Sequence, residues 1–199
     1  MSESNERIRE ILGAVAQDGA ARAGRSLTGL VGQDIRIHVP NVRLGTRADT
    51  CDAVGGDTAM VLGAYLGMSG DLEGHVMLLF PEKRALECVD LMFGRPVGTT
   101  TEADEMAKSA VAELGNIVGS AFVNALADHV QLMLHPSPPT VVHDMAIALV
   151  QTIYAEILAR GNEVVMIDTV FEDRNGQAAG LVIVAPDPHS LPRIEELAA

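Results

Sequence analysis

Residues 109–139 read SAVAELGNIVGSAFVNALADHVQLMLHPSPP, and this stretch predicts the long helix around which the rest of the chain is organised. Apolar residues recur in it at spacings of three and four, with no proline before Pro136, as is typical of an amphipathic helix. These apolar positions are Leu114, Ile117, Val118, Ala121, Phe122 and Ala125. At roughly 100° per residue their side chains share one sector of the helix, which we expect to be buried.

Three polar residues lie on the opposite sector of this helix. Ser109, Glu113 and Asn116 are spaced by four and then three residues, so their side chains fall close together. Exposed helix faces carry Glu and Asn routinely, so position alone does not make this group a site. Asn116 nevertheless lowers the stability of the helix locally, because asparagine is a poor helix former, and the neighbouring Gly115 weakens the helix further. The carboxylate and the carboxamide are therefore candidates for function.

The full pattern, Ser109-x3-Glu113-x2-Asn116 followed by Pro139, resembles the signature of the CheC/CheX/FliY family. These proteins are phosphatases of the response regulator CheY in bacterial and archaeal chemotaxis. The context AELGNIVGSAF and the later PSPPTVVHDMA resemble CheC rather than CheX, and the likeness extends to the closing APDPHSLPRIEEL. We expect an α/β (α+β) fold of the CheC type, with a mainly antiparallel sheet, two long flanking helices and pseudo-two-fold internal symmetry.

Composition narrows the class of partner. The formal net charge of -13 opposes binding to nucleic acid or to an anionic membrane, because both need clustered Lys and Arg. Cys51 and Cys88 are isolated, which predicts neither a disulfide framework nor a zinc site. The polar opening MSESNERIRE is not a signal peptide, and we expect no apolar run long enough to span a bilayer. We therefore predict a cytoplasmic protein.

The periodicity of the remaining chain predicts alternating helices and strands. We expect helices over residues 4–31, 82–93, 102–130, 144–159 and 190–198, and strands over 34–39, 59–68, 74–80, 131–134, 163–171 and 178–185. The first strand should end at Pro40, and residues 41–56 should form a loop or an irregular crossover. Two pairs of strands, 59–68 with 74–80 and 163–171 with 178–185, are expected to form hairpins.

The same order of elements occurs twice, which predicts one domain over residues 1–199 made of two repeats, 4–98 and 99–199. Each repeat has a long helix, a strand, an intervening segment, a hairpin and a short helix. Asn116 lies 23 residues before Pro139, just as Gln17 lies 23 residues before Pro40.

This frame aligns Ser109, Glu113 and Asn116 with Glu10, Ala14 and Gln17. Ala14 cannot form an ion pair, and the Gln17 carboxamide is one methylene longer than that of Asn116, so we expect no activity there. In the alternative register Glu10 pairs with Gly13, which has no side chain to position water. The first site is degenerate in either register, and one active site is expected.

The resemblance implies hydrolysis of an aspartyl phosphate, a reaction that requires few catalytic groups from the phosphatase. An aspartyl phosphate is already activated, so a phosphatase has only to place a water molecule in line and stabilise the transfer. A carboxamide is an uncharged donor and acceptor, so Asn116 is the candidate for orienting that water. The resemblance implies that Glu113 forms an ion pair with a lysine of the regulator. It also implies that Mg²⁺ is held in the acidic pocket of CheY, and we expect no metal or cofactor in this chain.

Other residues receive supporting roles. Ser109 caps the helix or forms a local hydrogen bond, and Pro139 fixes the chain after the short strand. His129, His135 and His143 match no zinc motif.

Two other functions remain open. The first is a non-enzymatic adaptor that binds and regulates a CheD-type receptor deamidase, with Asp144, at the start of the 144–159 helix, as a candidate interface residue. The second is a flagellar switch component related to FliM or FliY, which is disfavoured because the chain ends soon after the second repeat.

Overall fold

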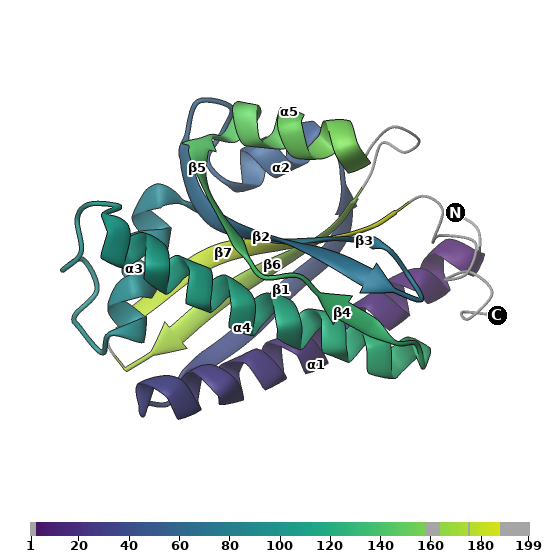
Figure 1. The fold of residues 1–199 in the computed structure, drawn as a ribbon, viewed down its shortest axis with the longest axis horizontal. Helices are drawn as coiled ribbons and strands as arrows, with labels where there is room; N and C mark the ends of the chain where they lie inside the picture. The colour runs from purple at the N-terminus through teal and green to yellow at the C-terminus, as the bar shows by residue number, and fades with distance from the viewer. Residues whose placement is uncertain (1–2, 158–163, 175, 188–199) are drawn as a thin grey trace.

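The computed structural model describes residues 3–157, 164–174 and 176–187, and in these ranges it forms five helices and seven strands (Figure 1). The elements follow one another along the chain as α1 (Glu3–Val31), β1 (Arg36–Gly45), α2 (Arg47–Ala53), β2 (Met60–Gly70), β3 (Gly74–Pro81), α3 (Glu82–Met92), α4 (Glu105–Val130), β4 (Leu134–Pro136), β5 (Thr140–Met145), α5 (Ala146–Ile157), β6 (Val164–Asp173) and β7 (Gly176–Pro186). The predicted helix over 190–198 lies outside the described residues.

All seven strands join one sheet, in the order β1-β6-β7-β3-β2-β4, and β5 also pairs with β2. Strands β4 and β5 pair with different parts of β2, residues 68–70 and 60–65 respectively. Every pairing between these strands is antiparallel, which confirms the predicted α/β class and both predicted hairpins, β2–β3 and β6–β7. From one edge of the sheet, the outer strand β1 is followed by the β6–β7 hairpin. From the other edge, the outer strands β4 and β5 are followed by the β2–β3 hairpin, so the two hairpins meet in the middle. An internal duplication would produce this order, while the duplication and the boundary between residues 98 and 99 stay predictions.

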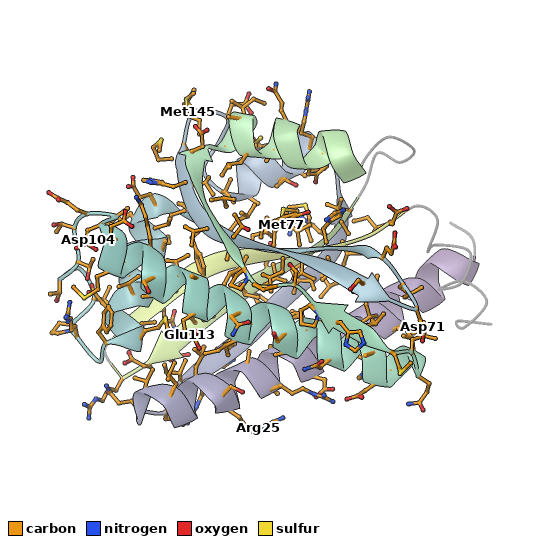
Figure 2. The ribbon with its side chains drawn as sticks, viewed as in Figure 1. Arg25, Asp71, Met77, Asp104, Glu113 and Met145 are labelled. Carbon is orange, nitrogen blue, oxygen red and sulfur yellow. The ribbon has the colours of Figure 1, made fainter. Side chains whose placement is uncertain are left out.

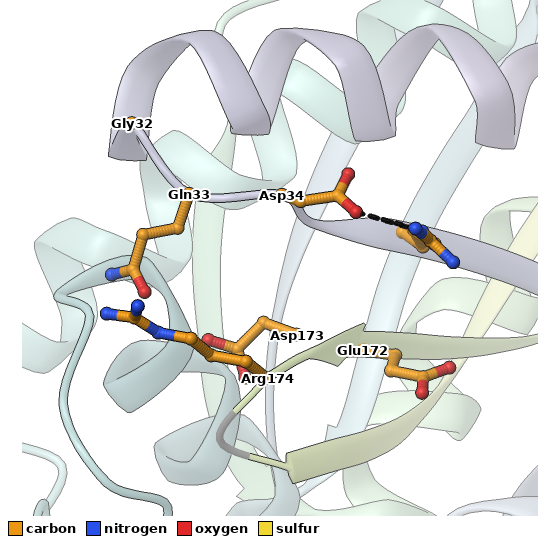
Figure 3. Close-up of a pocket in the computed structure, with 7 residues that line it drawn as sticks. Gly32, Gln33, Asp34, Glu172, Asp173 and Arg174 are labelled. Atoms are coloured by element: carbon orange, nitrogen blue, oxygen red, sulfur yellow. Dashed lines mark hydrogen bonds and ion pairs between the residues drawn. The ribbon is translucent and has the colours of Figure 1, made fainter.

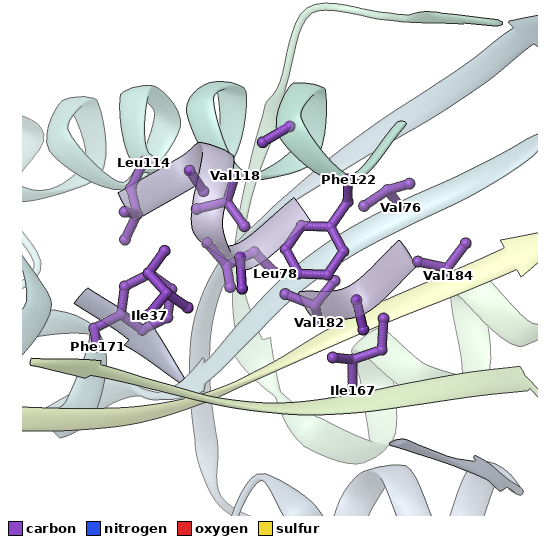
Figure 4. Close-up of a cluster of buried hydrophobic side chains, with 14 of the residues drawn as sticks. Ile37, Val76, Leu78, Leu114, Val118, Phe122, Ile167, Phe171, Val182 and Val184 are labelled. Atoms are coloured by element: carbon purple, nitrogen blue, oxygen red, sulfur yellow. The ribbon is translucent and has the colours of Figure 1, made fainter. Parts of the chain in front are cut away.

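The sheet is covered on both faces, so its central strands are apolar on both sides. In β3, Val76, Leu78 and Phe80 belong to the core beneath α1, α3 and α4, whereas Met77 and Leu79 belong to a second core beneath α2 and α5. This division follows from the strand geometry, because successive side chains point to opposite faces. Figure 4 shows the first core, where Leu114, Val118 and Phe122 of α4 reach the sheet.

The two long helices cross on the same face of the sheet (Figure 1). Their contact is close at Gly19 of α1, where an added Cβ would lie 2.9 Å from the ring of Phe122 in α4. Arg22 then links the helices, since its guanidinium lies 2.7 Å from Asp18 and 2.6 Å from Asp128. The hydrogen bond from Arg22 holds the pKa of the Asp18 carboxyl below its usual value.

The predicted end of the first strand at Pro40 is wrong. Strand β1 continues to Gly45, and its register with β6 shifts between His38 and Asn41. Pro40 therefore lies in a bulge, where the ladder does not need the N–H group that proline lacks.

The expected loop over 41–56 is also wrong, because it contains the end of β1 and the short helix α2. Thr46 caps α2 in a capping box with Asp49, so local side-chain bonds start a helix that has too few turns to show an apolar period. Helix α4 begins at Glu105 rather than 102, since the Asp104 carboxylate caps it by accepting from the N–H of Ala107. Gln131 ends α4 in the left-handed conformation, which delays β4 to Leu134.

Helix α4 also corrects the expectation that no apolar run could span a bilayer. Among the described residues it is the one helix whose length and mean hydropathy, 1.4 over 18 residues, would allow it to cross a membrane. In the fold 61% of that window is buried, since its apolar side chains pack on the sheet. The hydropathy of α4 is thus accounted for by its place in the core.

Candidate functional site

Helix α4 lies unusually close to strand β2, because its residues facing that strand are small. An added Cβ at Gly115 would lie 2.2 Å from the Cβ of Ala64, and one at Gly119 would lie 2.8 Å from the side chain of Leu66. Glycine is needed at these positions for close approach and not for an unusual backbone angle. This packing fixes the rotation of α4 about its axis and so determines which side chains face outward.

Glu113 and Asn116 are both exposed, one turn apart on the outer side of α4, as predicted. Figure 2 labels Glu113 near the middle of the helix. Neither side chain has a hydrogen bond or ion pair with another residue in the described part of the chain. A carboxylate and a carboxamide are thus presented together and are available to an outside partner.

Of the predicted supporting residues, Ser109 is exposed on α4, whereas Pro139 is half-buried beside the helix. The Cβ of Pro139 would be 3.9 Å from a Cβ added at Gly115, the residue immediately before Asn116. Pro139 therefore lies beside the turn of α4 that carries Asn116. The structure thus brings Pro139 to the middle of α4 and leaves Ser109 one turn before Glu113.

A bulge in the edge of the sheet places Pro139 there. Strand β2 pairs with β4 up to Pro136 and with β5 from Thr140, so residues 137–139 leave the ladder. Ser137 anchors this bulge by two bonds to β2: its N–H donates to the carbonyl of Gly67 at 2.8 Å, and its Oγ accepts from the N–H of Gly67 at 2.9 Å. The Ser137 hydroxyl also donates to the carbonyl of Pro138 at 3.1 Å.

Ser137 was missed by the sequence analysis, although a signal was present. In the run Ser137-Pro138-Pro139, only the serine has a backbone N–H, so it alone can donate to a neighbouring strand from its backbone. A serine before two prolines at the end of a short strand therefore indicates the anchor of the turn.

The first half of the chain presents a different surface. Ala14 and Gln17 are exposed on α1, while Glu10 lies in α1 with its side chain outside the description. The Nε2 of Gln17 donates to the carbonyl of Val39, at 3.3 Å, in the bulge of β1 that contains Pro40. The carboxamide of Gln17 is thus bound to the backbone, unlike that of Asn116.

The prediction that Asp144 opens a helix is wrong. It lies in the exposed strand β5, and α5 begins two residues later, at Ala146. The Asp144 carboxylate accepts from the N–H of Met145 at 2.7 Å. Met145 pairs across the ladder with Met60, and both methionines are about two-fifths exposed (43% and 40%). Asp144 therefore borders an apolar pair on the surface.

The described residues contain no group of three or more His, Cys, Asp and Glu side chains that could hold a metal ion. Two of the histidines considered above have other partners. The Nε2 of His143 lies 3.1 Å from Glu82, and the Nδ1 of His129 lies 2.9 Å from the carbonyl of Ala125.

A surface hollow of about 490 Å³ lies away from these residues, between the end of α1 and the β6–β7 turn (Figure 3). It is lined by Gly32, Gln33, Asp34, Arg36, Glu172, Asp173 and Arg174. Asp34 and Arg36 form an exposed ion pair across its rim, at 2.8 Å. None of the site residues predicted from the sequence lines this hollow.

Three comparisons relate this chain to known proteins. The family described as Chemotaxis phosphatase CheX matches residues 62–160. CheY-P phosphatase CheC of Bacillus subtilis (strain 168) is 30% identical over 174 residues, which cover 86% of this chain and 83% of that protein. CheY-P phosphatase CheX of Thermotoga maritima is 34% identical over 77 residues, covering 39% of this chain and 48% of that protein.

The fold has a solved counterpart in the crystal structure of Thermotoga maritima FliY. The two chains superpose with a TM-score of 0.76 at 21% sequence identity, over 100% of this chain and 96% of the other. At this identity the likeness shows a common fold.

Proposed function

Since the chain belongs to the CheC/CheX/FliY family of chemotaxis phosphatases, we propose that it hydrolyses the aspartyl phosphate of the response regulator CheY with Glu113 and Asn116 of α4. The observation that carries this proposal is the exposure of both side chains, without partners among the described residues, on one side of a rigidly packed helix. Groups on a helix enter a partner's pocket with better-defined geometry than groups on a loop.

Asn116 is the catalytic residue in this proposal. Its carboxamide can accept a hydrogen bond from a water molecule and donate one to a phosphoryl oxygen, without adding charge near the anionic phosphate. Fixing the water in line converts an encounter with bulk solvent into a reaction within the complex, and this positioning is the main contribution available to the protein. Mg²⁺ in the acidic pocket of CheY would neutralise charge on the phosphate.

Glu113 is the docking residue. Its carboxylate is exposed one turn before Asn116, where it can form an ion pair with a lysine beside the phosphorylated aspartate. The pair becomes partly desolvated when the two proteins meet, which strengthens it relative to an exposed surface pair. Glu113 should therefore affect the KM for phosphorylated CheY more than the kcat.

Loss of phosphate from Mg²⁺-bound phospho-CheY tests both roles. We expect Asn116→Ala to lower kcat on the order of a hundredfold, which is the usual effect of removing one side chain that hydrogen-bonds to a transition state. We expect Glu113→Ala to raise KM. Asn124→Ala is the matched control, since Asn124 is also exposed on α4, two turns beyond Asn116. Wild-type rates in both Asn116→Ala and Glu113→Ala would contradict the assignment.

The first half is not expected to contribute a second site. Ala14 has no charge for docking, and the Gln17 amide is bound to the carbonyl of Val39. We therefore expect Asn116→Ala/Gln17→Ala to turn over phospho-CheY at the same reduced rate as Asn116→Ala. Residual turnover in Asn116→Ala that disappears in Asn116→Ala/Gln17→Ala would show a second active site instead.

Binding of a CheD-type deamidase is the second candidate function. The exposed pair Met60 and Met145 beside Asp144 supports it, because an apolar patch next to a charge is typical of a protein interface. A pull-down with the cognate CheD tests this reading, with Met145→Ser and Asp144→Ala expected to weaken capture. Absence of any complex with the wild-type chain would remove it.

A further inference from the structure

One large apolar side chain is exposed on α4, and it lies on the same face as the candidate site. Met106 is 54% exposed, whereas the other apolar side chains of this helix are buried or half-buried. It precedes Glu113 by seven residues, about 20° short of two full turns, so the two side chains leave the helix in nearly the same direction. Met106 therefore lies about 10 Å from Glu113 along the axis, on the side away from Asn116.

Local bonds hold Met106 in the first turn of the helix. The Asp104 carboxylate accepts from the N–H of Ala107 at 2.7 Å, and Lys108 forms an ion pair with Glu105 at 3.1 Å. These bonds keep residue 106 in the helical conformation. An apolar group on a preorganised backbone loses less conformational entropy on binding than one on a mobile segment.

The charges of α4 favour the same partner as the site. Glu113 is the one charged residue between positions 109 and 127, and Lys108, the one Lys or Arg of the helix, lies about 140° from it around the axis. No cation of α4 therefore competes for the Glu113 carboxylate with the lysine that the proposed function assigns to CheY. The exposed neighbours of Glu113 on this face, Ser109 and Asn116, are uncharged, so covering them removes no further charge from water.

An interface of ordinary size, centred on the site, would include Met106. Each partner in such an interface contributes about 800 Å², which corresponds to a disc of about 16 Å radius. Met106 is about 13 Å from the midpoint between Glu113 and Asn116, whereas the far end of α4 is about 23 Å from it. Met133, which is 71% exposed and whose N–H donates to Asp71 at 2.9 Å, lies beyond that far end (Figure 2).

We infer that Met106 is a docking residue for phosphorylated CheY: it contacts an apolar side chain of the regulator about 10 Å from the lysine that pairs with Glu113, on the side away from the phosphate. The inference rests on the proposed function, since it takes the position of CheY from Glu113 and Asn116. It adds an apolar contact to an ion pair that salt would weaken.

Met106→Gln tests the contact in the phosphatase assay, because glutamine matches methionine in length and helix propensity but is polar. Burial of the exposed half of a methionine side chain changes affinity by about fivefold, so we expect the KM for phospho-CheY to rise by about that factor with kcat unchanged. Met106→Leu keeps an apolar side chain and should have the wild-type KM. Met133→Gln is the matched control, and both constants should stay unchanged in it.

NMR spectroscopy observes the same contact without turnover. In the chain labelled with ¹³C at the methionine methyl groups, the Met106 signal is identified by its loss in Met106→Leu. It should shift when CheY is added with Mg²⁺ and beryllium fluoride, which together form a stable analogue of the aspartyl phosphate. The Met133 signal should stay in place.

A wild-type KM for Met106→Gln overturns the inference, and so does a Met106 signal that CheY leaves unchanged. A Met106 signal that shifts with the concentration of this chain alone also overturns it, since the contact would then be with a second copy. Failure of the proposed function is seen separately, as wild-type turnover in Asn116→Ala, and the NMR titration reports on the Met106 contact in either case.

Discussion

At the scale of single residues, Asp90 organises the loop that leads into α4. Its side chain is fully buried, and its carboxylate accepts from the N–H groups of Gly98, Thr99 and Thr100 at 2.8, 2.8 and 3.0 Å and from the hydroxyl of Thr100 at 2.6 Å. A buried charge is tolerated when several donors surround it. Asp90 thus fixes the chain five residues before the helix that carries Glu113 and Asn116.

Replacing Asp90 with alanine should be severely destabilising. The change leaves three backbone donors without their acceptor, so we expect the free energy of unfolding to fall by at least about 3 kcal/mol in denaturant titrations. The matched control is Asp34→Ala, which removes a carboxylate that forms an ion pair with Arg36, the side chains of both residues being 68% exposed. That variant should stay within about 0.5 kcal/mol of the wild type. Equal losses in the two variants would contradict the role of Asp90.

The two cysteines should be unreactive in the folded protein. Burial raises the pKa of the Cys51 thiol to about 11, with a smaller contribution from Asp57, and burial raises the pKa of Cys88 well above its ordinary value. Only the thiolate reacts with iodoacetamide, so both residues should remain unmodified at pH 8 by mass spectrometry. Both should be alkylated once urea unfolds the chain. Rapid labelling of either cysteine under native conditions would show that its environment opens in solution.

At the scale of the elements, the sequence predicted those that carry a clear period. The helices α1, α3 and α4 and the hairpins β2–β3 and β6–β7 follow from apolar spacing and turn residues. Elements decided by local bonds or by pairing were missed. The helix α2 depends on a capping box, and β5 becomes a strand because β2 offers it a partner, although its sequence TVVHDM runs directly into a helical pattern.

The close packing of α4 on β2 gives an element-scale prediction. Gly115→Ala places a methyl group 2.2 Å from the Cβ of Ala64, so the helix must move away from the strand. We expect a loss of about 1–3 kcal/mol in unfolding free energy, together with lower phosphatase activity, because overpacking displaces Asn116 beside it.

Gly13→Ala is the matched control for Gly115→Ala. Gly13 also lies within a long helix, but nothing is found within 4 Å of its added Cβ. Alanine should therefore stabilise α1 by about 0.5–1 kcal/mol and leave activity unchanged. Thermal melts and phosphate-release rates distinguish the two variants. A Gly115→Ala protein as stable and active as the wild type would show that the helix has room to shift.

At the scale of the whole molecule, the face that carries the candidate site was predictable while its surroundings were not. The 3.6-residue period of α4 was enough to place Glu113 and Asn116 together and outward. Their environment depends on residues distant in sequence, since Gly67 of β2 anchors Ser137 and Ala64 sets the depth of the helix. Periodicity within one segment carries no information about such pairings between segments.

The same arrangement suggests that the first half can be converted into a working site. Restoring the residue types at corresponding positions requires Ala14→Glu for docking and Gln17→Asn for a carboxamide one methylene shorter than the one that binds Val39.

We expect these two changes, made in the Asn116→Ala background, to restore measurable phosphate loss from phospho-CheY. Omitting Ala14→Glu should raise KM, by the same reasoning that assigns docking to Glu113. A folded protein that carries both changes and has no activity above the Asn116→Ala background would mean that the two faces differ in more than these side chains. The bulge geometry, in which β1 stays one continuous strand while β4 and β5 separate, would then be the difference to alter next.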